Sequence, residues 1–370
     1  MKLKLSLLAL ATLLAVSCID NMKLEKKKIA NSSKVKNSPN AFKYWTWITA
    51  NPQRVDSSYT NEFKKYHQSG IDAVLINTNA DPELLDRLVP LAKEQNIEVH
   101  AWIMAMNRPG DSLALQHPEW YAVSREGKST YDTRPYVDYY QWMCPTREDS
   151  RNHVLELVEG LSKVDGITSV HLDYIRLPDI FLPIGLLPKY NLKQEEELPE
   201  FDFCYCNICL EEFEKIHHKN PKDMKNPAID MEWKQFRLNK IKSVVDSAYQ
   251  IVHKNGKNLT AAVFPYPEMA DHMVRQRWDK WDVDAVLPMI YNNFYNEDLE
   301  WIGFATNQGV QDLEKRDIEL HTGIYVPPMS ATDVAESINQ AKENGANGIS
   351  FFDGNALTKE QLQVIKASKK

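Results

Sequence analysis

The clearest potential for chemistry lies in the segment 166–179, where an apolar run at 167–172 ends abruptly in Asp173, Arg176 and Asp179. A buried parallel strand that ends in charged residues is typical of the rim of an α/β barrel. The strand fixes the backbone, so an acid just past its end is held rigidly at a pocket mouth, where it could act in catalysis. An Asp–Arg pair could instead only fasten a loop, because structural ion pairs are common.

Glycoside hydrolysis is a reaction that such an acid could carry out, but it normally needs two carboxyl groups. Asp173 is the first candidate, and we predict a nucleophile or base because the charge of Arg176 would keep it ionised. The predicted partner is Glu268, because two preceding prolines stiffen its loop, although it could also be a plain surface acid. Asp353 comes next and could instead cap the following helix. Asp179 is the third choice for the partner.

Aromatic, amide and charged side chains gather at the ends of the predicted strands. Tryptophan and tyrosine rings can lie against the apolar faces of pyranose sugars, and polar groups can bind the sugar hydroxyls. Any one of these aromatic residues could be core packing, but their recurrence at successive strand ends favours a carbohydrate site. The predicted substrate-binding residues are Trp47, Asn77, His100, Trp102, Arg176, Tyr266, Tyr291 and Asn292.

A second group is a tight C-x-C-x2-C cluster formed by Cys204, Cys206 and Cys209. Together with Cys144 it could supply four thiolates to a closed tetrahedral zinc site, and a histidine at 217–218 could replace Cys144. A disulfide is the competing interpretation, because exported chains meet oxidising surroundings, and free buried thiols are the third. Any metal here would be structural, and we expect no cofactor to be required for catalysis.

These residues must be positioned by a regular alternation of strand and helix patterns. Strands are predicted at 42–50, 71–77, 98–106, 168–174, 259–264, 285–291, 320–326 and 348–353. Helices are predicted at 82–95, 147–164, 233–254 and 331–344, with a long aromatic-rich loop at 107–145 and an irregular insertion at about 178–230. Eight strands without a second strand-rich block, and without a G-x-G-x-x-G after the first strand, predict an α/β fold with a single (β/α)8 TIM barrel over 42–366.

The N-terminus has the pattern of a targeting segment. Two lysines precede an apolar stretch, and Leu-Ala-Val-Ser-Cys then ends at Cys18, which resembles the lipobox of bacterial lipoproteins. We therefore expect a lipoprotein signal peptide at 1–18, lipidation of Cys18, and a flexible linker at 19–41 rich in Lys, Asn and Ser. An ordinary signal peptide or a core segment is the alternative. The expected location is the bacterial cell envelope, with the lipid as the membrane anchor.

Composition narrows the partners further. The chain has a formal net charge of -7, and no lysine- and arginine-rich helix stands out, so nucleic acid is not an expected partner. The expected partners are an oligo- or polysaccharide and, through the anchor, a membrane.

Several blocks together resemble, in order, the glycosyl-hydrolase-like family ten proteins, barrel domains distantly related to family 10 glycosidases. The blocks are Ile97–Trp102, Cys144–Arg151, Gly166–Pro178, Trp233–Arg237, Gln276–Trp281, Val283–Tyr291 and Gly348–Asp353. The resemblance covers roughly 42–365 and implies a barrel and a carbohydrate-active enzyme, often a lipoprotein. One departure is that the glutamate pair of true family 10 xylanases, at the ends of strands four and seven, is not evident.

The leading hypothesis is thus a glycoside hydrolase that cleaves O-glycosidic bonds of a cell-envelope or imported glycan with two carboxyl groups. The alternative is a lipoprotein barrel that binds carbohydrate on Trp47, Trp102 and Tyr291 without cleaving it. A metal-dependent deacetylase or hydrolase is the third hypothesis. It is disfavoured because no H-x-H pair of metal ligands appears at the strand ends.

Overall fold

The structure is a computed structural model that describes residues 41–369 of the 370-residue chain. The predicted signal peptide, Cys18 and all but the last residue of the predicted linker lie outside the described residues. Within the described range no helix combines the length and the apolar character that a membrane span requires.

Eight parallel strands close into one barrel in sequential order, β1 pairing with β2 and so on round to β8, which pairs with β1. This confirms the predicted TIM barrel. The strands are β1 Lys43–Thr49, β2 Ala73–Asn77, β3 Glu98–Met104, β4 Ser169–Asp173, β5 Asn258–Val263, β6 Ala285–Pro288, β7 Glu319–Tyr325 and β8 Gly348–Phe352.

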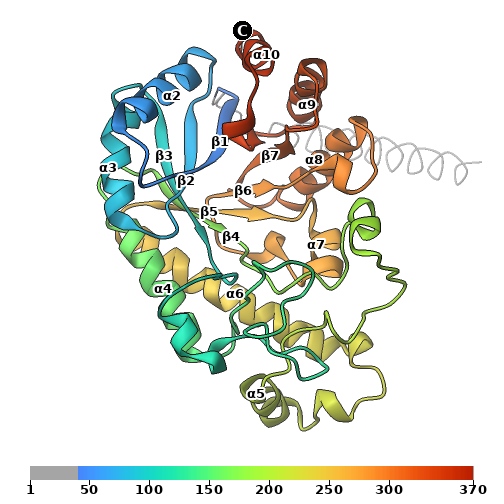
Figure 1. The fold of residues 1–370 in the computed structure, drawn as a ribbon. Helices are drawn as coiled ribbons and strands as arrows, with labels where there is room; N and C mark the ends of the chain where they lie inside the picture. Colours follow the sequence, from blue (N-terminus) through green and yellow to red (C-terminus); the bar gives the residue numbers. More distant parts are fainter. Residues whose placement is uncertain (1–40, 370) are drawn as a thin grey trace, which may run out of the picture. The chain divides into compact units, whose positions relative to one another are not determined.

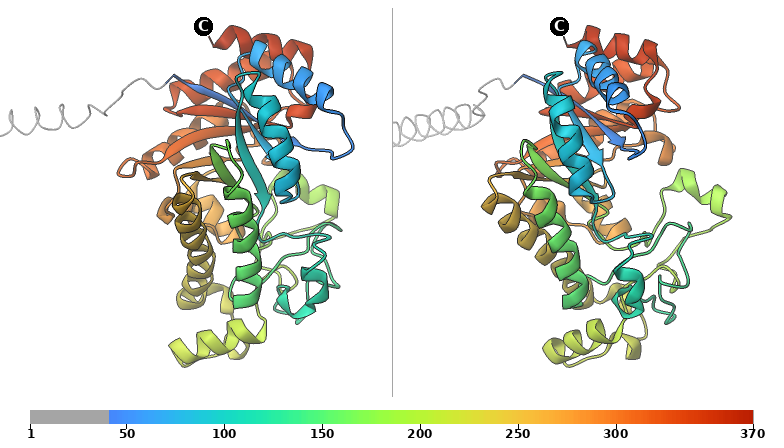
Figure 2. Two further views of the ribbon diagram at one scale, coloured as in Figure 1. Left: turned by 90° about the vertical axis from the view of Figure 1, so that its left-hand side faces the viewer. Right: turned by 60° about the vertical axis from the view of Figure 1, so that its left-hand side comes forward.

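Helices surround the strands (Figure 1). They are α2 Asp56–Gln68, α3 Pro82–Lys93, α4 Glu148–Ser162, α5 Asn207–His217, α6 Met231–Lys254, α7 Pro267–Val274, α8 Glu300–Asp312, α9 Ala331–Glu343 and α10 Lys359–Ser368. The predicted insertion is not irregular throughout, because it contains α5, which lies at the lower end of α4 and α6 in both views of Figure 2. Besides α5, the helices α2, α7, α8 and α10 are additional to those predicted from the sequence.

Local sequence sets several helix starts. Asp81 accepts hydrogen bonds from the backbone N–H groups of residues 83 and 84, and Pro82 opens α3 with its fixed φ. Ser330 and Asp333 form a reciprocal capping box at α9, and Thr358 forms one with Gln361 at α10. These caps fix where the chain turns from each strand into the next helix, and so they set the loops at the barrel ends.

The barrel interior is packed with aromatic residues around a polar centre. Side chains alternate along each strand, so Trp45 and Trp47 of β1 and Trp102 of β3 point inward. Trp47 Nε1 donates a hydrogen bond to Nε2 of His171 at 3.1 Å, and His171 Nδ1 lies 2.8 Å from Thr260 Oγ1. Burial lowers the pKa of His171 well below its ordinary value. His171 is therefore a neutral, hydrogen-bonded core residue beneath the carboxyl ends of the strands.

Candidate active site

A cavity of about 520 Å³ opens at the C-terminal ends of the strands, where TIM-barrel enzymes hold their active sites. Its floor is formed by Trp47 and Trp102, and its walls come largely from loops. Tyr136, Tyr139 and Tyr140 belong to the loop after β3, and several residues of the insertion after β4 also line it. Thirteen of the 24 residues that line the cavity are aromatic, so its surface is mostly flat rings with phenol groups.

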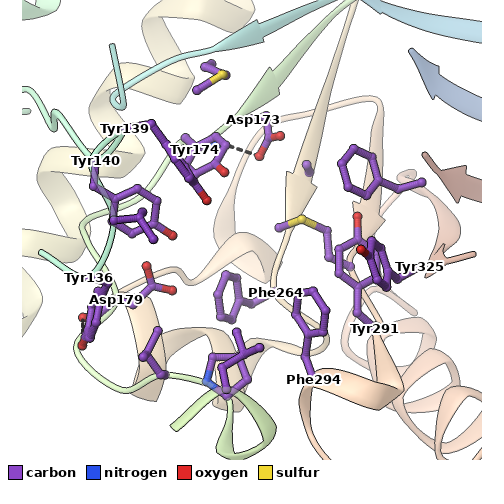
Figure 3. Close-up of a pocket in the computed structure, with 18 of the residues that line it drawn as sticks. Tyr136, Tyr139, Tyr140, Asp173, Tyr174, Asp179, Phe264, Tyr291, Phe294 and Tyr325 are labelled. Carbon is purple, nitrogen blue, oxygen red and sulfur yellow. Dashed lines mark hydrogen bonds between the residues drawn. The ribbon is translucent and has the colours of Figure 1, made fainter. Parts of the chain in front are cut away.

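Asp173, the last residue of β4, projects into this cavity (Figure 3). Its Oδ2 accepts a hydrogen bond from Trp102 Nε1 at 3.1 Å, and its Oδ1 accepts one from the backbone N–H of Tyr174 at 2.7 Å. Burial raises the pKa of Asp173 to about 6, although the two hydrogen bonds and the charge of Arg176 act in the opposite direction. A carboxyl group that keeps its proton up to near-neutral pH is suited to proton donation.

The chain turns sharply directly after this acid. Tyr174 has a φ of 50°, in the left-handed region that a bulky residue occupies only at an energetic cost. This conformation aims the backbone N–H of Tyr174 back at the carboxyl group of Asp173. Strain of this kind persists only where the surroundings enforce it, and it is concentrated at functional sites.

Arg176 is not the partner of Asp173 that the sequence predicts. Its guanidinium Nη1 donates to Asp179 Oδ2 at 3.1 Å and to the backbone oxygen of the next residue at 3.0 Å. The guanidinium also lies 4.7 Å from the centre of the Trp142 ring and 5.0 Å from that of Phe264. It is buried behind the cavity and does not line it. Because burial outweighs the effect of its charge, the expectation that Arg176 keeps Asp173 ionised is corrected.

Asp179, the third choice from the sequence, is the other carboxylate that lines the cavity among the described residues. Its ion pair with Arg176 is buried on both sides, with 6% and 4% of the two side chains exposed. Its backbone oxygen accepts a hydrogen bond of 2.9 Å from the Tyr136 hydroxyl, which ties the insertion to the loop after β3. Figure 3 shows Asp173 and Asp179 facing the same space, with the tyrosines of the loop on one side.

The chain matches a family model described as "Putative glycosyl hydrolase domain" over residues 57–319. The chain belongs to this family. The match supports the glycoside hydrolase part of the resemblance found in the sequence, whereas the assignment to family ten stays a prediction. None of the curated proteins is similar enough to match.

Solved structures show that the barrel of this glycosyl hydrolase domain is shared with glycosidases. The catalytic domain of β-amylase from Paenibacillus polymyxa has a TM-score of 0.61 at 9% identity, over 87% of this chain and 95% of that chain. β-Galactosidase from Marinomonas ef1 has a TM-score of 0.64 at 10% identity, over 89% of this chain and 59% of that chain. The chain therefore spans less than two thirds of that β-galactosidase, and at these identities the likeness shows the fold alone.

Two predicted carboxylates lie outside the cavity of the glycosyl hydrolase domain. Glu268 is exposed in the first turn of α7, because the prolines before it start a helix there. Asp353 is half-buried, and its side chain accepts a 2.7 Å hydrogen bond from the backbone N–H of Asn355. Burial raises the pKa of Asp353, but the side chain caps the one-turn helix 354–356, which is close to the capping alternative raised from the sequence. Of the three other candidate carboxylates, only Asp179 therefore shares the cavity with Asp173.

Four of the eight predicted substrate-binding residues do not line the cavity, namely Arg176, described above, and His100, Tyr266 and Asn292. His100 is two residues before Trp102, so it points into the barrel one layer further from the cavity. Its Nδ1 lies 2.6 Å from Ser169 Oγ, toward the end of the barrel opposite the cavity. Tyr266 packs edge-on against Phe304, outside the cavity. Asn292 donates a hydrogen bond to a backbone oxygen within its own loop and does not line the cavity either.

Trp47, Asn77, Trp102 and Tyr291 do line the cavity of the glycosyl hydrolase domain. The two tryptophans are only 2% and 7% exposed, so they form a floor and not open stacking platforms. The most open ring in the wall is Tyr139, which is 48% exposed and belongs to a loop that the sequence marks only as rich in aromatic residues. The metal prediction concerns a separate place, where the four predicted cysteines are buried together outside the cavity lining.

Proposed function

We propose that this protein is a glycoside hydrolase that cleaves O-glycosidic bonds with Asp173 as general acid and Asp179 as nucleophile or base. The observation that carries the proposal is that both carboxyl groups line one aromatic cavity, where burial raises the pKa of Asp173 to about 6 and Asp179 is ion-paired with Arg176. Two carboxyl groups in environments of different polarity can divide the proton-donating and electron-donating roles. Arg176 then acts as a positioning residue, because it fixes the carboxylate of Asp179.

The charge of the cavity favours a neutral glycan as substrate. The described residues that line it include two carboxylates and no lysine, arginine or histidine. A uronate or sulfate group would therefore meet negative charge without a cation to bind it. The phenol groups and the amide of Asn77 can hydrogen-bond to hydroxyl groups, and the ring faces can pack against the apolar faces of sugars. We propose a cell-envelope or imported oligosaccharide that carries no acidic groups.

The test is a panel of neutral and uronate-containing oligosaccharides, with product analysis for the wild type, Asp173→Asn, Asp179→Asn and Glu268→Gln. The two aspartate variants should each lower kcat/KM by about a hundred- to ten-thousandfold. Glu268→Gln is the matched control and should keep the wild-type rate, because its side chain is exposed outside the cavity. With Asp173 as the acid, wild-type kcat/KM should fall as the pH rises above about 6.

Three results would change this conclusion. Turnover that falls below pH 6 would make Asp173 a base, as the sequence predicts. Loss of turnover in Glu268→Gln, with Asp179→Asn active, would restore the pair chosen from the sequence. Glycan binding by the wild type without any cleavage, and kept in Asp173→Asn, would instead support the non-catalytic carbohydrate-binding barrel.

A further inference from the structure

The side chains of Cys144, Cys204, Cys206 and Cys209 converge on one point in the protein interior. All four are buried, and their sulfur atoms lie within 4.8 Å of one another. Cys144 Sγ is 3.4 Å from Cys206 Sγ and 3.6 Å from Cys209 Sγ, and the last two are 3.5 Å apart. A single point is therefore close to four sulfur atoms that come from two separate parts of the chain.

These separations match a metal tetrahedron better than a disulfide. A disulfide joins two sulfur atoms at about 2.05 Å, much less than the 3.4–3.6 Å that separates the sulfur atoms of Cys144, Cys206 and Cys209. Zinc–thiolate bonds of about 2.3 Å give a tetrahedron with sulfur–sulfur edges of about 3.8 Å. We propose that Cys144, Cys204, Cys206 and Cys209 bind one Zn²⁺ ion as four thiolates in a closed structural site.

The surrounding backbone is arranged to support thiolates. Cys206 is the N-cap of α5 and Cys209 lies in its first turn, where backbone N–H groups point outward and favour negative charge. The backbone N–H of Val123 donates to Cys204 Sγ at 3.4 Å, and Thr146 Oγ1 lies 3.1 Å from Cys209 Sγ. Contacts of this kind orient the ligands of a metal ion and tune its binding.

Burial explains why an ion is needed at this point. All four sulfur atoms are buried, and an isolated thiolate is poorly solvated in the interior. A divalent cation supplies the missing compensation, since metal binding releases the thiol protons and leaves the charges paired. Four buried thiols that share one centre thus form a ligand set, whereas unrelated core cysteines would have no reason to converge.

The position of the cluster gives the ion a defined role. Cys144 ends the loop after β3, which carries Tyr136, Tyr139 and Tyr140 of the cavity wall, and the other three cysteines belong to the insertion after β4 that carries Asp179. The ion therefore joins the two segments that form one side of the cavity. Asp173 is on a barrel strand and does not depend on this link. Zinc should hold the cavity wall in place, and removal of the zinc should leave the barrel intact.

The first experiment measures metal content of the full chain carrying Cys18→Ser, so that only the four clustered cysteines remain. After expression without added zinc and gel filtration, elemental analysis should find one zinc per chain. Adding Cys206→Ser or Cys209→Ser should remove it, whereas Ser150→Ala, which changes a buried side chain beside Cys144, should keep it. Cobalt exchanged into the site should give the thiolate charge-transfer and visible bands of a tetrahedral complex.

A second measurement covers variants that fail to fold. In the zinc-bound Cys18→Ser protein the four thiols should resist a thiol reagent, and a chelator should expose all four. Proteolysis within 107–147 and 178–230 should then become about tenfold faster or more, while the barrel strands stay protected. Two outcomes would overturn the proposal. In one, the protein holds no metal and has lost two titratable thiols for each disulfide formed. In the other, the protein holds no metal, all four thiols react and proteolysis is unchanged. Stoichiometric iron would overturn the choice of metal.

Discussion

The burial of Asp173 predicts a cost to stability that Asp173→Asn should remove in a pH-dependent way. In the folded protein burial raises the pKa of Asp173 to about 6, from an ordinary value of 3.8. Between these two pH values the folded state still holds a proton that the unfolded state has released. The free energy of unfolding of the wild type should therefore fall as the pH rises from about 4 to about 6.

The size of this effect follows from the two pKa values. Each pH unit between them corresponds to about 1.4 kcal/mol, so ionised Asp173 should destabilise the fold by about 3 kcal/mol at pH 7 relative to pH 4. Asparagine does not titrate and removes this dependence. Asp173 now accepts hydrogen bonds from the N–H groups of Trp102 and Tyr174, and the amide nitrogen of asparagine would face one of these donors. The lost hydrogen bond costs stability, but this cost is the same at every pH.

The assay is urea unfolding of the wild type and Asp173→Asn, followed by tryptophan fluorescence at several pH values from 4 to 7. Relative to that of the wild type, the free energy of unfolding of the variant should rise by about 3 kcal/mol between pH 4 and pH 7. Asp111→Asn is a control whose difference from the wild type should stay nearly constant from pH 4 to 7, because a lowered pKa places the titration of Asp111 below this range. Burial alone would raise the pKa of Asp111, but hydrogen bonds from His153, Ala114 and Arg108 bring it below its ordinary value. A difference between the wild type and Asp173→Asn that stays constant with pH would refute the reasoning and the role of Asp173 as acid.

Three further predictions concern the support of the site and the N-terminus. Arg176→Leu should destabilise the fold by about 3–5 kcal/mol in thermal or urea unfolding, because it leaves the carboxylate of Asp179 buried and unpaired. Adding Asp179→Asn to this variant should recover most of the lost stability. Gly323→Ala should cost about 1–3 kcal/mol, because a Cβ there would lie 2.7 Å from the Pro288 oxygen and 3.1 Å from the Trp47 ring, whereas Gly160→Ala in open space on α4 should be neutral or slightly stabilising. Cys18→Ser should abolish incorporation of labelled fatty acid and move the protein from the membrane to the soluble fraction, and unchanged fractionation would contradict lipid anchoring.

The barrel was predictable because burial leaves a strong local pattern. Each strand of a parallel barrel is covered on both faces, so it appears in the sequence as a short apolar run, and eight such runs recur along the chain. Helix α2 escaped prediction because it buries only Tyr59, Phe63 and Tyr66 among polar residues. The helix α5 escaped because it packs against α6 and not against the strands, so it is not part of the strand–helix alternation.

The site was only partly predictable, because some of its residues are placed by local sequence patterns and others by contacts between distant parts of the chain. Asp173 follows directly from its strand, and Trp47 and Trp102 follow from side-chain alternation on theirs. The choice between Glu268 and Asp179 depends on how two loops fold back, which no local pattern encodes. The environment of Arg176 was also inaccessible, because the rings of Trp142 and Phe264 that its guanidinium contacts are far away in the sequence, although its ion-pair partner Asp179 is only three residues along.

The two proposed catalytic groups are held by different kinds of structure, and this has a consequence for specificity. Asp173 is fixed by a barrel strand and by the floor tryptophan Trp102, so its position is set by the core of the fold. Asp179 and most of the tyrosine wall are fixed by two long segments that the cysteine cluster and the Tyr136 hydrogen bond join together. Changes in these segments can reshape the cavity around a constant acid, which is how barrel enzymes vary their substrates. We therefore expect substitutions in the wall to alter KM and glycan preference, and substitutions at Asp173 to alter kcat.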